Sequence, residues 1–356
     1  MPATHLSSML VKQLNNLKQS VPHMTEDSLS RPLRDLRISI TDRCNFRCNY
    51  CMPPEEFSQS HEFLPRSEIL SFEEITLIIK SMLKLGLRKV RITGGEPLLR
   101  KDICKLISMI RECDSNLDIA LTTNGSLLGK FASNLVKSGL DRVTVSLDAI
   151  DDEMIGRISN SNVTSKEIID GIIAAKNSGL EVKVNTVVIK GFNENQILPM
   201  VELFYRMNIV VRFIEYMDVG GTKDWNPNQV VFGNEIRTLI GQNIGKLSPV
   251  EDSKYGEVAN RWSFDSGYEI GFIESISNPF CKSCTRARIS ANGSIYTCLF
   301  SEQGHDLKSL IKLGADANDI SNAIAAIWEK RDDRYSEIRH TISSSSTPVQ
   351  MHFIGG

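Results

Sequence analysis

The sequence predicts an α/β fold in which parallel strands alternate with crossover helices. From about residue 35, short segments rich in β-branched residues are each followed by an amphipathic segment of helical period. Such alternation is typical of βα units that build a parallel sheet. Six strands are predicted, fewer than the eight of a closed TIM barrel, so the alternation alone allows an open partial barrel or a doubly wound sheet.

The strands and helices are assigned from their periodicity and their boundary residues. The predicted strands cover residues 36–41, 89–95, 119–125, 142–148, 182–191 and 210–217. The predicted helices between them cover residues 72–86, 102–112, 127–139, 165–179 and 195–208. Three of these helices end at a glycine, which is the favoured residue just after a helix C-terminus: Gly86, Gly139 and Gly179.

The side chains of the six strands divide into a polar face and an apolar face, because residues two apart on a strand share a face. The polar face carries Arg37, Ser39, Thr41, Arg91, Thr93, Thr122, Asn124, Thr144, Ser146, Asp148, Lys183, Asn185 and Arg212. A parallel sheet covered by helices on both sides would be apolar on both faces. The pattern therefore favours a barrel whose lumen holds a polar, anionic ligand. Internal salt bridges around a packed interior are the alternative.

The pattern changes after about residue 227. One helix is predicted at 232–243, followed by β-rich sequence and a last helix at about 317–331. Asn292-Gly293 lies between two alternating runs and predicts a β-hairpin. We therefore expect a weakly ordered N-terminal extension over residues 1–30, a barrel over 31–226 and a separate C-terminal region over 227–356.

Composition and charge exclude several classes of protein. The 356 residues are 41% hydrophobic and 24% charged, as in ordinary globular proteins. Lys and Arg number 41 against 43 Asp and Glu, so the net charge of −2 gives no reason to expect nucleic acid or an anionic membrane as a partner. No apolar run approaches the roughly 20 residues that cross a bilayer, and no export signal is recognisable. We expect a cytoplasmic protein with reduced cysteines.

Three of the eight cysteines fall in the stretch "CNFRCNYCMPP" (44–54), directly after the first predicted strand. They are Cys44, Cys48 and Cys51, an odd number that cannot pair off internally as disulfides. A structural zinc site closes with four protein ligands, whereas a [4Fe–4S] cluster on three thiolates keeps one iron open for a small molecule. A zinc loop completed by a distant ligand such as His61 is the alternative.

A second triplet, Cys281, Cys284 and Cys298, has the spacing C-x2-C-x13-C and lies beside the predicted hairpin. A zinc knuckle is again the alternative, but two incomplete three-cysteine sites in one chain favour clusters over zinc. Arg286 and Arg288 alternate on one strand face next to these cysteines. Arginine makes bidentate contacts with phosphate groups and purine edges, so this strand is a candidate binding site for a nucleotide.

The string "ITDRCNFRCNYCMP", with "TGGEPLL" (93–99) and "SLD" (146–148), resembles the radical S-adenosylmethionine (SAM) enzymes over roughly residues 35–215. The resemblance implies a partial (βα)6 TIM-type barrel with a C-terminal β-containing extension. It also implies that a [4Fe–4S] cluster on the first triplet binds SAM through its open iron and cleaves it to a 5′-deoxyadenosyl radical. The SAM contacts implied by the motifs are Tyr50, Gly95, Ser146 and Met217.

Both triplets together, with "RAR" (286–288) and the terminal "GG", resemble the GTP 3′,8-cyclase family of molybdenum cofactor biosynthesis over about residues 31–356. The resemblance implies a lyase that removes hydrogen from C3′ of GTP and joins C3′ to C8. The implied product is (8S)-3′,8-cyclo-7,8-dihydroguanosine 5′-triphosphate. A second [4Fe–4S] cluster on Cys281, Cys284 and Cys298 would meet the guanine through its open iron.

The same resemblance implies roles for individual residues and partners. The implied GTP contacts are Arg37, Arg91, Thr122, Lys183, Arg286, Ala287 and Arg288. Arg212 is a further candidate for a triphosphate contact, because it shares the parity of the polar face. The residues implied to act in catalysis are Arg37, Arg286, Arg288, Gly355 and Gly356. The implied partners are a reductant protein and the downstream cyclic pyranopterin monophosphate synthase, with the chain as a monomer or homodimer.

Two other interpretations remain open from the sequence. One is a radical SAM enzyme with an auxiliary cluster and another substrate, such as a peptide. The other is a non-catalytic, zinc-binding interaction protein.

Overall fold

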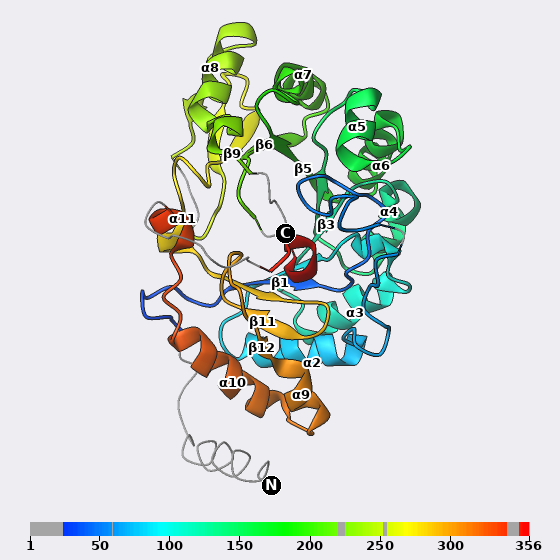
Figure 1. Cartoon of the computed structure of the whole chain (residues 1–356), viewed down its shortest axis with the longest axis vertical. Coiled ribbons are helices and arrows are strands. Elements are labelled where there is room, and N and C mark those ends of the chain that lie inside the picture. Colours follow the sequence, from blue (N-terminus) through cyan, green and yellow to red (C-terminus); the bar gives the residue numbers. More distant parts are fainter. Residues whose placement is uncertain (1–23, 59, 220–224, 252–254, 340–348, 356) are drawn as a thin grey trace.

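Six consecutive parallel strands form the centre of the sheet (Figure 1). The computed structural model describes residues 24–58, 60–219, 225–251, 255–339 and 349–355. The six strands are β1 (Asp35–Ser39), β2 (Lys89–Thr93), β3 (Asp118–Thr123), β4 (Arg142–Ser146), β5 (Glu181–Val188) and β6 (Val210–Glu215). Each strand pairs in parallel with the next along the chain. All six predicted strands are confirmed.

Helices follow the strands and cover the outside of the sheet (Figure 1). They are α2 (Phe72–Leu83), α3 (Ile103–Cys113), α4 (Leu128–Lys137), α5 (Asp152–Ser159), α6 (Ser165–Asn177) and α7 (Ile197–Arg206). Capping boxes at Ser71 and Thr164 start α2 and α6. Gly86, Gly139 and Gly179 follow α2, α4 and α6 with positive φ, as predicted. The short helix α5 was not predicted.

The C-terminal region adds strands at both edges of this sheet. They are β7 (Ser248–Pro249), β8 (Asn260–Ser263), β9 (Glu269–Ile273), β10 (Arg286–Ile289), β11 (Ser294–Tyr296) and β12 (His305–Asp306). β9 pairs in parallel with β6, and β10 pairs in parallel with β1. Among the described residues the sheet therefore has the order β12-β11-β10-β1-β2-β3-β4-β5-β6-β9-β8-β7 and is not closed.

This topology confirms the predicted partial barrel with a C-terminal β-containing extension, and it shows how the extension attaches. The extension continues the barrel sheet on two sides instead of forming a layer of its own. The predicted hairpin is β10–β11, in which Gly293 has a φ of 90°. The division of the chain at residue 226 stays a prediction, because β9 and β10 share the sheet with the six central strands.

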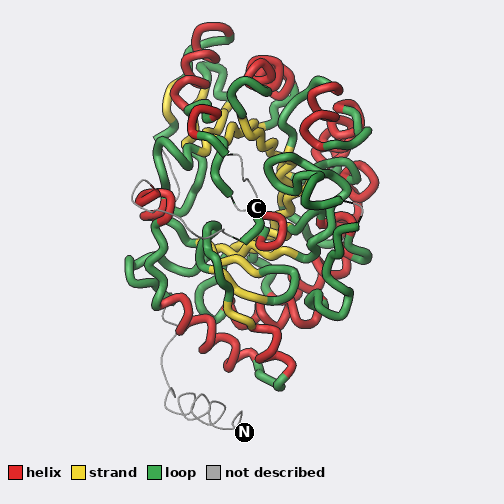
Figure 2. Tube along the Cα trace, viewed as in Figure 1, coloured by secondary structure: helices red, strands yellow, loops and turns green. Residues whose placement is uncertain are grey.

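Further helices follow β6 along the chain, and Figure 2 shows helices of the chain in red around the strands in yellow. The helices that follow β6 are α8 (Gly233–Asn243), α9 (Leu307–Lys312), α10 (Ala317–Glu329), α11 (Tyr335–Ile338) and α12 (Met351–Ile354). Helix α10 packs against α2 on the outside, whereas α12 packs against β1 near the centre of the molecule (Figure 1). No helix in the described segments is long and apolar enough to span a membrane.

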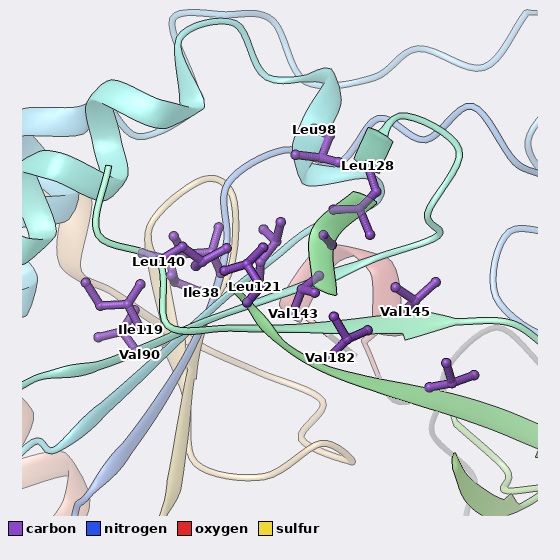
Figure 3. Close-up of a cluster of buried hydrophobic side chains, with 14 of the residues drawn as sticks. Ile38, Val90, Leu98, Ile119, Leu121, Leu128, Leu140, Val143, Val145 and Val182 are labelled. Atoms are coloured by element: carbon purple, nitrogen blue, oxygen red, sulfur yellow. The ribbon is translucent and has the colours of Figure 1, made fainter. Parts of the chain in front are cut away.

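The hydrophobic core fills the space between the outer face of the sheet and the surrounding helices (Figure 3). Ile38, Val90, Leu121, Val143 and Val145 point toward the helices and are all at most 1% exposed. Because side chains alternate across a strand, burying these residues outward turns the polar face inward. The core thus determines which side chains line the interior of the curved sheet.

The end of the predicted N-terminal extension differs from the expectation. Residues 1–23 lie outside the described part of the chain, but Thr25 and Asp27 are buried, and Leu33 donates a backbone hydrogen bond to Thr25. An isolated bridge joins Glu26 to Pro32. The segment from residue 25 is therefore packed on the folded body, which the weak hydrophobic pattern of this region did not indicate.

Substituting Phe204 tests the contribution of the outer core. Phe204 on α7 is fully buried, so Phe204→Ala should lower the free energy of unfolding by about 3–5 kcal/mol. Arg206 lies two residues further with its side chain 78% exposed, and Arg206→Ala should change stability by no more than about 0.5 kcal/mol. Urea unfolding of the iron-free protein measures both. Equal effects of the two substitutions would contradict the assignment of this helix face.

Candidate active site

The inner face of the curved sheet surrounds a cavity of about 400 Å³. Of the residues predicted for the polar face, all but Ser39 and Thr41 line this cavity, and these two are buried behind its wall. The strand register places Arg37 beside both Arg91 and Arg288, and Thr144 beside Lys183. The prediction of a polar lumen is therefore confirmed, and the packed interior is excluded.

Cations outnumber carboxylates on the cavity wall. Among the described lining residues there are nine Lys or Arg and five Asp or Glu, a formal excess of four positive charges. Lys183 pairs with Glu181 at 2.8 Å and Arg142 pairs with Asp118, but Arg37, Arg91 and Arg212 form no ion pair with a described carboxylate. Burial of unpaired charge is costly, so this wall is suited to a polyanionic ligand.

Neutral hydroxyl groups position the unpaired arginines. Arg91 donates to the hydroxyls of Thr122 and Thr144, each at 3.1 Å, and Arg212 donates to Thr144 at 3.2 Å. Burial and the neighbouring Arg286 and Arg91 lower the pKa of Arg37 to about 9. Burial and the neighbouring Arg212 and Arg142 likewise lower the pKa of Arg91 to about 9. An anion bound among these groups would relieve the repulsion.

The first cysteine triplet lies in the loop after β1 and lines one end of the cavity. The loop turns tightly, because the amides of Cys51 and Met52 both donate to the carbonyl of Cys48. All three thiols are free of disulfides. Burial raises the pKa of Cys44 to about 11 and of Cys51 to about 12, and it also raises the pKa of Cys48 well above its usual value. Thiolates at this site therefore need the positive charge of a metal centre.

The second triplet lines the same cavity and lies next to Arg286, Arg288 and Arg331. Cys281 is the first residue of the single turn η4 (Cys281–Ser283), Cys284 directly follows it, and Cys298 follows β11. Burial raises the pKa of Cys298 to about 11. Burial also acts on Cys284, but the positive charges of Arg286 and Arg331 prevail and lower its pKa to about 6. One thiol of this triplet is thus stabilised as a thiolate by the protein itself.

The placement of the thiols bears on the choice between zinc and iron–sulfur clusters. Within the described segments, no three His, Cys, Asp or Glu side chains converge on a point where they could hold one metal ion. A zinc ion requires such convergence, whereas a [4Fe–4S] cluster binds each thiolate to a different iron. The thiols of both triplets line one cavity, an arrangement that three-cysteine cluster sites would have.

The loop around Gly95 brings the second strand close to the cysteine loop. Gly95 donates to the carbonyl of Thr41 at 2.8 Å, and Glu96 donates to the carbonyl of Arg43 at 2.8 Å. A Cβ atom on Gly95 would lie 2.3 Å from the carbonyl oxygen of Arg43, so only glycine fits. The carboxylate of Glu96 accepts from Thr123 and from the amide of Asn124, which fixes the loop against β3.

The C-terminal tail ends inside the curve of the sheet, where Figure 1 marks the C-terminus. The carbonyl of Gly355 accepts a hydrogen bond from Arg288, and the carbonyl of His352 accepts one from Ser39 at 3.4 Å. Gly355 has a φ of 78°, and a Cβ atom there would lie 2.2 Å from Thr93 Oγ1. The tail therefore reaches the arginines of the cavity wall through a residue without a side chain.

Comparison with known proteins identifies the family. Two family models match adjacent parts of the chain: the radical SAM superfamily over residues 38–204 and Molybdenum Cofactor Synthesis C over residues 209–337. The GTP 3′,8-cyclase of Staphylococcus epidermidis (strain RP62A) is 48% identical over 93% of this chain and 98% of its own length. The GTP 3′,8-cyclase of Staphylococcus aureus (strain JH9) is 45% identical over the same shares.

The chain belongs to the GTP 3′,8-cyclase family of radical SAM enzymes. Membership of this enzyme superfamily implies one [4Fe–4S] cluster and SAM binding. Streptococcus suis SuiB bound to S-adenosylmethionine superposes with a TM-score of 0.57 at 19% identity, covering 87% of this chain and 68% of that one. A structure of native anSMEcpe with bound AdoMet gives 0.52 at 14% identity, covering 89% and 93%. These two likenesses concern the fold.

The structure brings most of the residues implied by the family resemblance to one cavity. The lining includes Arg37, Cys44, Cys48, Tyr50, Cys51, Arg91, Gly95, Thr122, Ser146, Lys183, Arg212, Met217, Cys281, Cys284, Arg286, Arg288 and Cys298. Ala287 is different, because its methyl group lies in the hydrophobic core and its backbone alone can contribute to the site. Gly356 lies outside the described residues.

Sequence reasoning missed three cations of the cavity wall. Lys89 and Arg142 share the parity of Arg91 and Thr144, so extending the alternation to the first residue of each strand would have found them. Arg331 follows α10, far from any motif, and no local signal points to it. Asp148, which was assigned to the polar face, accepts a hydrogen bond from the hydroxyl of Tyr50 at 2.5 Å and so orients that ring.

Alkylation of the iron-free protein tests the charge on Cys284. A pKa lowered to about 6 leaves the thiolate present above about pH 6 and lost below it, so Cys284 should react with iodoacetamide half-maximally near that pH. Cys298 and Cys44 should stay slow up to pH 8. Arg286→Ala should move the midpoint for Cys284 upward. Peptide mass spectrometry across pH 5–9 reports each site, and a shared profile for Cys284 and Cys298 would contradict the assignment.

A substitution at Gly355 tests whether the C-terminal tail is held against the strands at this residue. Gly355→Ala adds a methyl group against Thr93 at a positive φ, so α12 should lose its contact with β1 and its amides should exchange hydrogen roughly tenfold faster. Gly314→Ala is the control for backbone strain alone, since its φ is 87° with no atom within 4 Å of the added Cβ. Unchanged exchange over residues 351–354 in Gly355→Ala would show that the tail is not held there.

Proposed function

We propose that this protein converts GTP to (8S)-3′,8-cyclo-7,8-dihydroguanosine 5′-triphosphate, the first step of molybdenum cofactor biosynthesis, with SAM as the source of the radical. The observation that carries the proposal is the excess of cations on the wall of one cavity that joins two cysteine triplets. A triphosphate carries up to four negative charges, and buried arginines are its natural ligands. Membership of the GTP 3′,8-cyclase family supports the same substrate.

SAM would bind at the first triplet. Cys44, Cys48 and Cys51 would hold a [4Fe–4S] cluster, which would supply the one electron needed to cleave the C–S bond of SAM to methionine and a 5′-deoxyadenosyl radical. Gly95 lets its loop pack directly on the backbone of the cysteine loop, and the exposed backbone of this loop would lie beside the methionine moiety. Tyr50, held by Asp148, together with Ser146 and Met217, would bind the adenosine part from the neighbouring strand ends.

GTP would bind between SAM and the second triplet. Arg91, Lys183 and Arg212 would hold the triphosphate, with Thr122 orienting Arg91 and with Lys89 and Arg142 adding positive charge. Arg37, Arg286 and Arg288, and the backbone at Ala287, would hold the guanosine end. We further propose that a second [4Fe–4S] cluster on Cys281, Cys284 and Cys298 contacts the guanine, since these cysteines also leave one ligand position open.

The arrangement accounts for the order of bonds made and broken. The 5′-deoxyadenosyl radical takes the hydrogen atom from C3′ of GTP and becomes 5′-deoxyadenosine. The carbon radical at C3′ then adds to C8 of guanine, and one electron and one proton complete the dihydro product. The protein must hold the ribose and the base rigidly and exclude water while radicals exist. Arg288, fixed by Gly355, and the tail ending at Gly356 would close the site for this purpose.

The proposed reaction also needs a protein that supplies electrons and an enzyme that consumes the product. We propose a reductant protein as the source of electrons, and the cyclic pyranopterin monophosphate synthase as the enzyme that consumes the product. Neither reaction requires a membrane or nucleic acid. We propose a cytoplasmic location and a monomer or homodimer, in keeping with the oxygen sensitivity expected of such clusters.

Anaerobic turnover tests the reaction and the role of Arg286 together. After reconstitution with iron and sulfide, the protein with SAM, GTP and a strong reductant should form 5′-deoxyadenosine and a cyclised GTP product, detected by mass spectrometry. Arg286→Ala should lower the rate of GTP conversion about 10- to 100-fold, the loss expected for a charged hydrogen bond, while SAM cleavage persists.

The matched control is Lys282→Ala, which removes an exposed cation four residues away that does not line the cavity. It should leave both rates unchanged. Formation of 5′-deoxyadenosine without any GTP-derived product in the unsubstituted protein would refute the proposed function and leave a radical SAM enzyme with another substrate. Equal loss of both products in Arg286→Ala would assign Arg286 to the integrity of the site instead of to GTP binding.

A further inference from the structure

Asp27 is a fully buried carboxylate that is bound by two arginines next to the second triplet. Its Oδ2 accepts from Arg31 Nε at 2.6 Å and from Arg331 Nη1 at 2.8 Å. The three side chains are at most 1% exposed. We call Asp27, Arg31 and Arg331 the buried triad. Desolvating three charges is costly, so the triad needs further hydrogen bonds to be tolerated in the interior.

Those further hydrogen bonds go to the segments that carry the second triplet. Arg331 donates to the carbonyl of Cys284 at 2.9 Å and to the carbonyl of Thr297, the residue before Cys298, at 3.0 Å. Arg31 donates to the carbonyl of Cys281 at 2.9 Å. One ion network thus binds the backbone at, or directly next to, all three cysteines.

The triad also ties the N-terminal segment to the end of α10. The hydroxyl of Ser28 donates to the carbonyl of Arg331 at 2.7 Å, and the indole of Trp328 donates to the carbonyl of Arg31 at 3.0 Å. Asp27 Oδ1 accepts from the amides of Leu29 and Arg31, which folds the segment into a tight loop. In the described part of the chain, the triad makes no hydrogen bond to the loop of Cys44, Cys48 and Cys51.

We propose that the buried triad is a positioning device for the second metal site, and that the N-terminal loop around Asp27 is part of that site. The argument rests on the proposed function, since it takes Cys281, Cys284 and Cys298 to be cluster ligands. Three ligands on a single-turn helix and the end of a hairpin have little secondary structure to fix their spacing. Each guanidinium is held by the carboxylate of Asp27 and donates hydrogen bonds to the backbone of the cysteine segments. These bonds fix the spacing of the three cysteines.

The role is selective, and this makes it testable. Weakening the triad should loosen the second triplet and leave the first triplet unaffected. Asp27→Asn removes the shared negative charge, and Arg331→Lys keeps the charge but removes the planar fork that reaches two carbonyls. Either variant suffices if the other fails to fold.

The chain offers a matched control pair. Arg111 pairs with Asp141 at 2.6 Å and donates to the carbonyls of Leu117 at 2.6 Å and Gly139 at 2.8 Å, so it is an arginine that also joins one carboxylate to the backbone of two loops. It lies on the outside of the sheet, away from both triplets. Asp141→Asn and Arg111→Lys therefore repeat the same chemical changes without touching a cysteine segment.

Two measurements decide the proposal. After anaerobic reconstitution, the unsubstituted protein and the control variants should bind about eight irons per chain, whereas Asp27→Asn and Arg331→Lys should bind about four. SAM cleavage, which needs the first cluster, should stay within about twofold, and GTP conversion should be lost. In the iron-free protein, alkylation of Cys281, Cys284 and Cys298 should be at least about fivefold faster in the triad variants, with Cys44, Cys48 and Cys51 unchanged.

The outcomes that overturn the proposal are distinct from those that overturn the proposed function. Equal loss of iron at both triplets, or faster alkylation of all six cysteines, would reduce the triad to a general stabilising element. Full iron content with unchanged alkylation would show that it positions nothing. If the unsubstituted protein binds about four irons, the second cluster itself is refuted. The alkylation comparison then still decides whether the triad holds the three cysteines in place.

Discussion

The constraint on which the rest of the structure depends is the burial of positive charge inside a curved sheet. Arg37, Arg91 and Arg212 lie among other cations, and no described carboxylate neutralises them. Their cost is tolerated because the opposite face of the same strands buries a continuous core of Ile, Val and Leu against the helices. Stability is therefore concentrated on the outer face, and the inner face is left short of negative charge. A bound polyanion would complete the electrostatics of the fold.

The two cysteine triplets line the same cavity but differ in the charges around their thiols. At the first triplet, burial raises the pKa of all three thiols, so a metal centre must displace their protons to bind. At the second triplet, Arg286 and Arg331 lower the pKa of Cys284 to about 6 against the effect of burial. The cations that line this part of the cavity therefore also set the charge of a neighbouring thiol. Charge substitutions near Cys284 should change both the charge of the cavity wall and the ionisation of this thiol.

The central strands, the polar lining of the cavity and the two cysteine triplets could be predicted from the sequence, because each depends on a local pattern of residues. Strand alternation gave the six central strands and the polar lining, and the cysteine spacing gave both triplets. The pairing of β9 with β6 and of β10 with β1 could not be predicted. Parallel edge pairing joins segments that are distant in the sequence, about 250 residues for β1 and β10, without any turn to mark it. The ion network of Asp27, Arg31 and Arg331 could not be predicted either, because residues that are distant in the sequence form it and no periodic pattern marks them.

The open sheet explains why both ends of the chain matter. A closed barrel satisfies every strand edge, but here the strand order ends at β12 and β7, so the lumen needs other walls. The C-terminal tail packs on β1 inside the lumen, where Gly355 reaches Arg288 of β10. Arg31 of the N-terminal loop donates to the carbonyl of Cys281 in the turn that leads into β10. Asp27 of the same loop pairs with Arg331, which donates to the carbonyl of Cys284 in that turn. Strand β10 is thus held from both sides by segments from the two ends of the described chain. Because Arg286 and Arg288 lie on that strand, their position depends on both segments and not on the barrel alone.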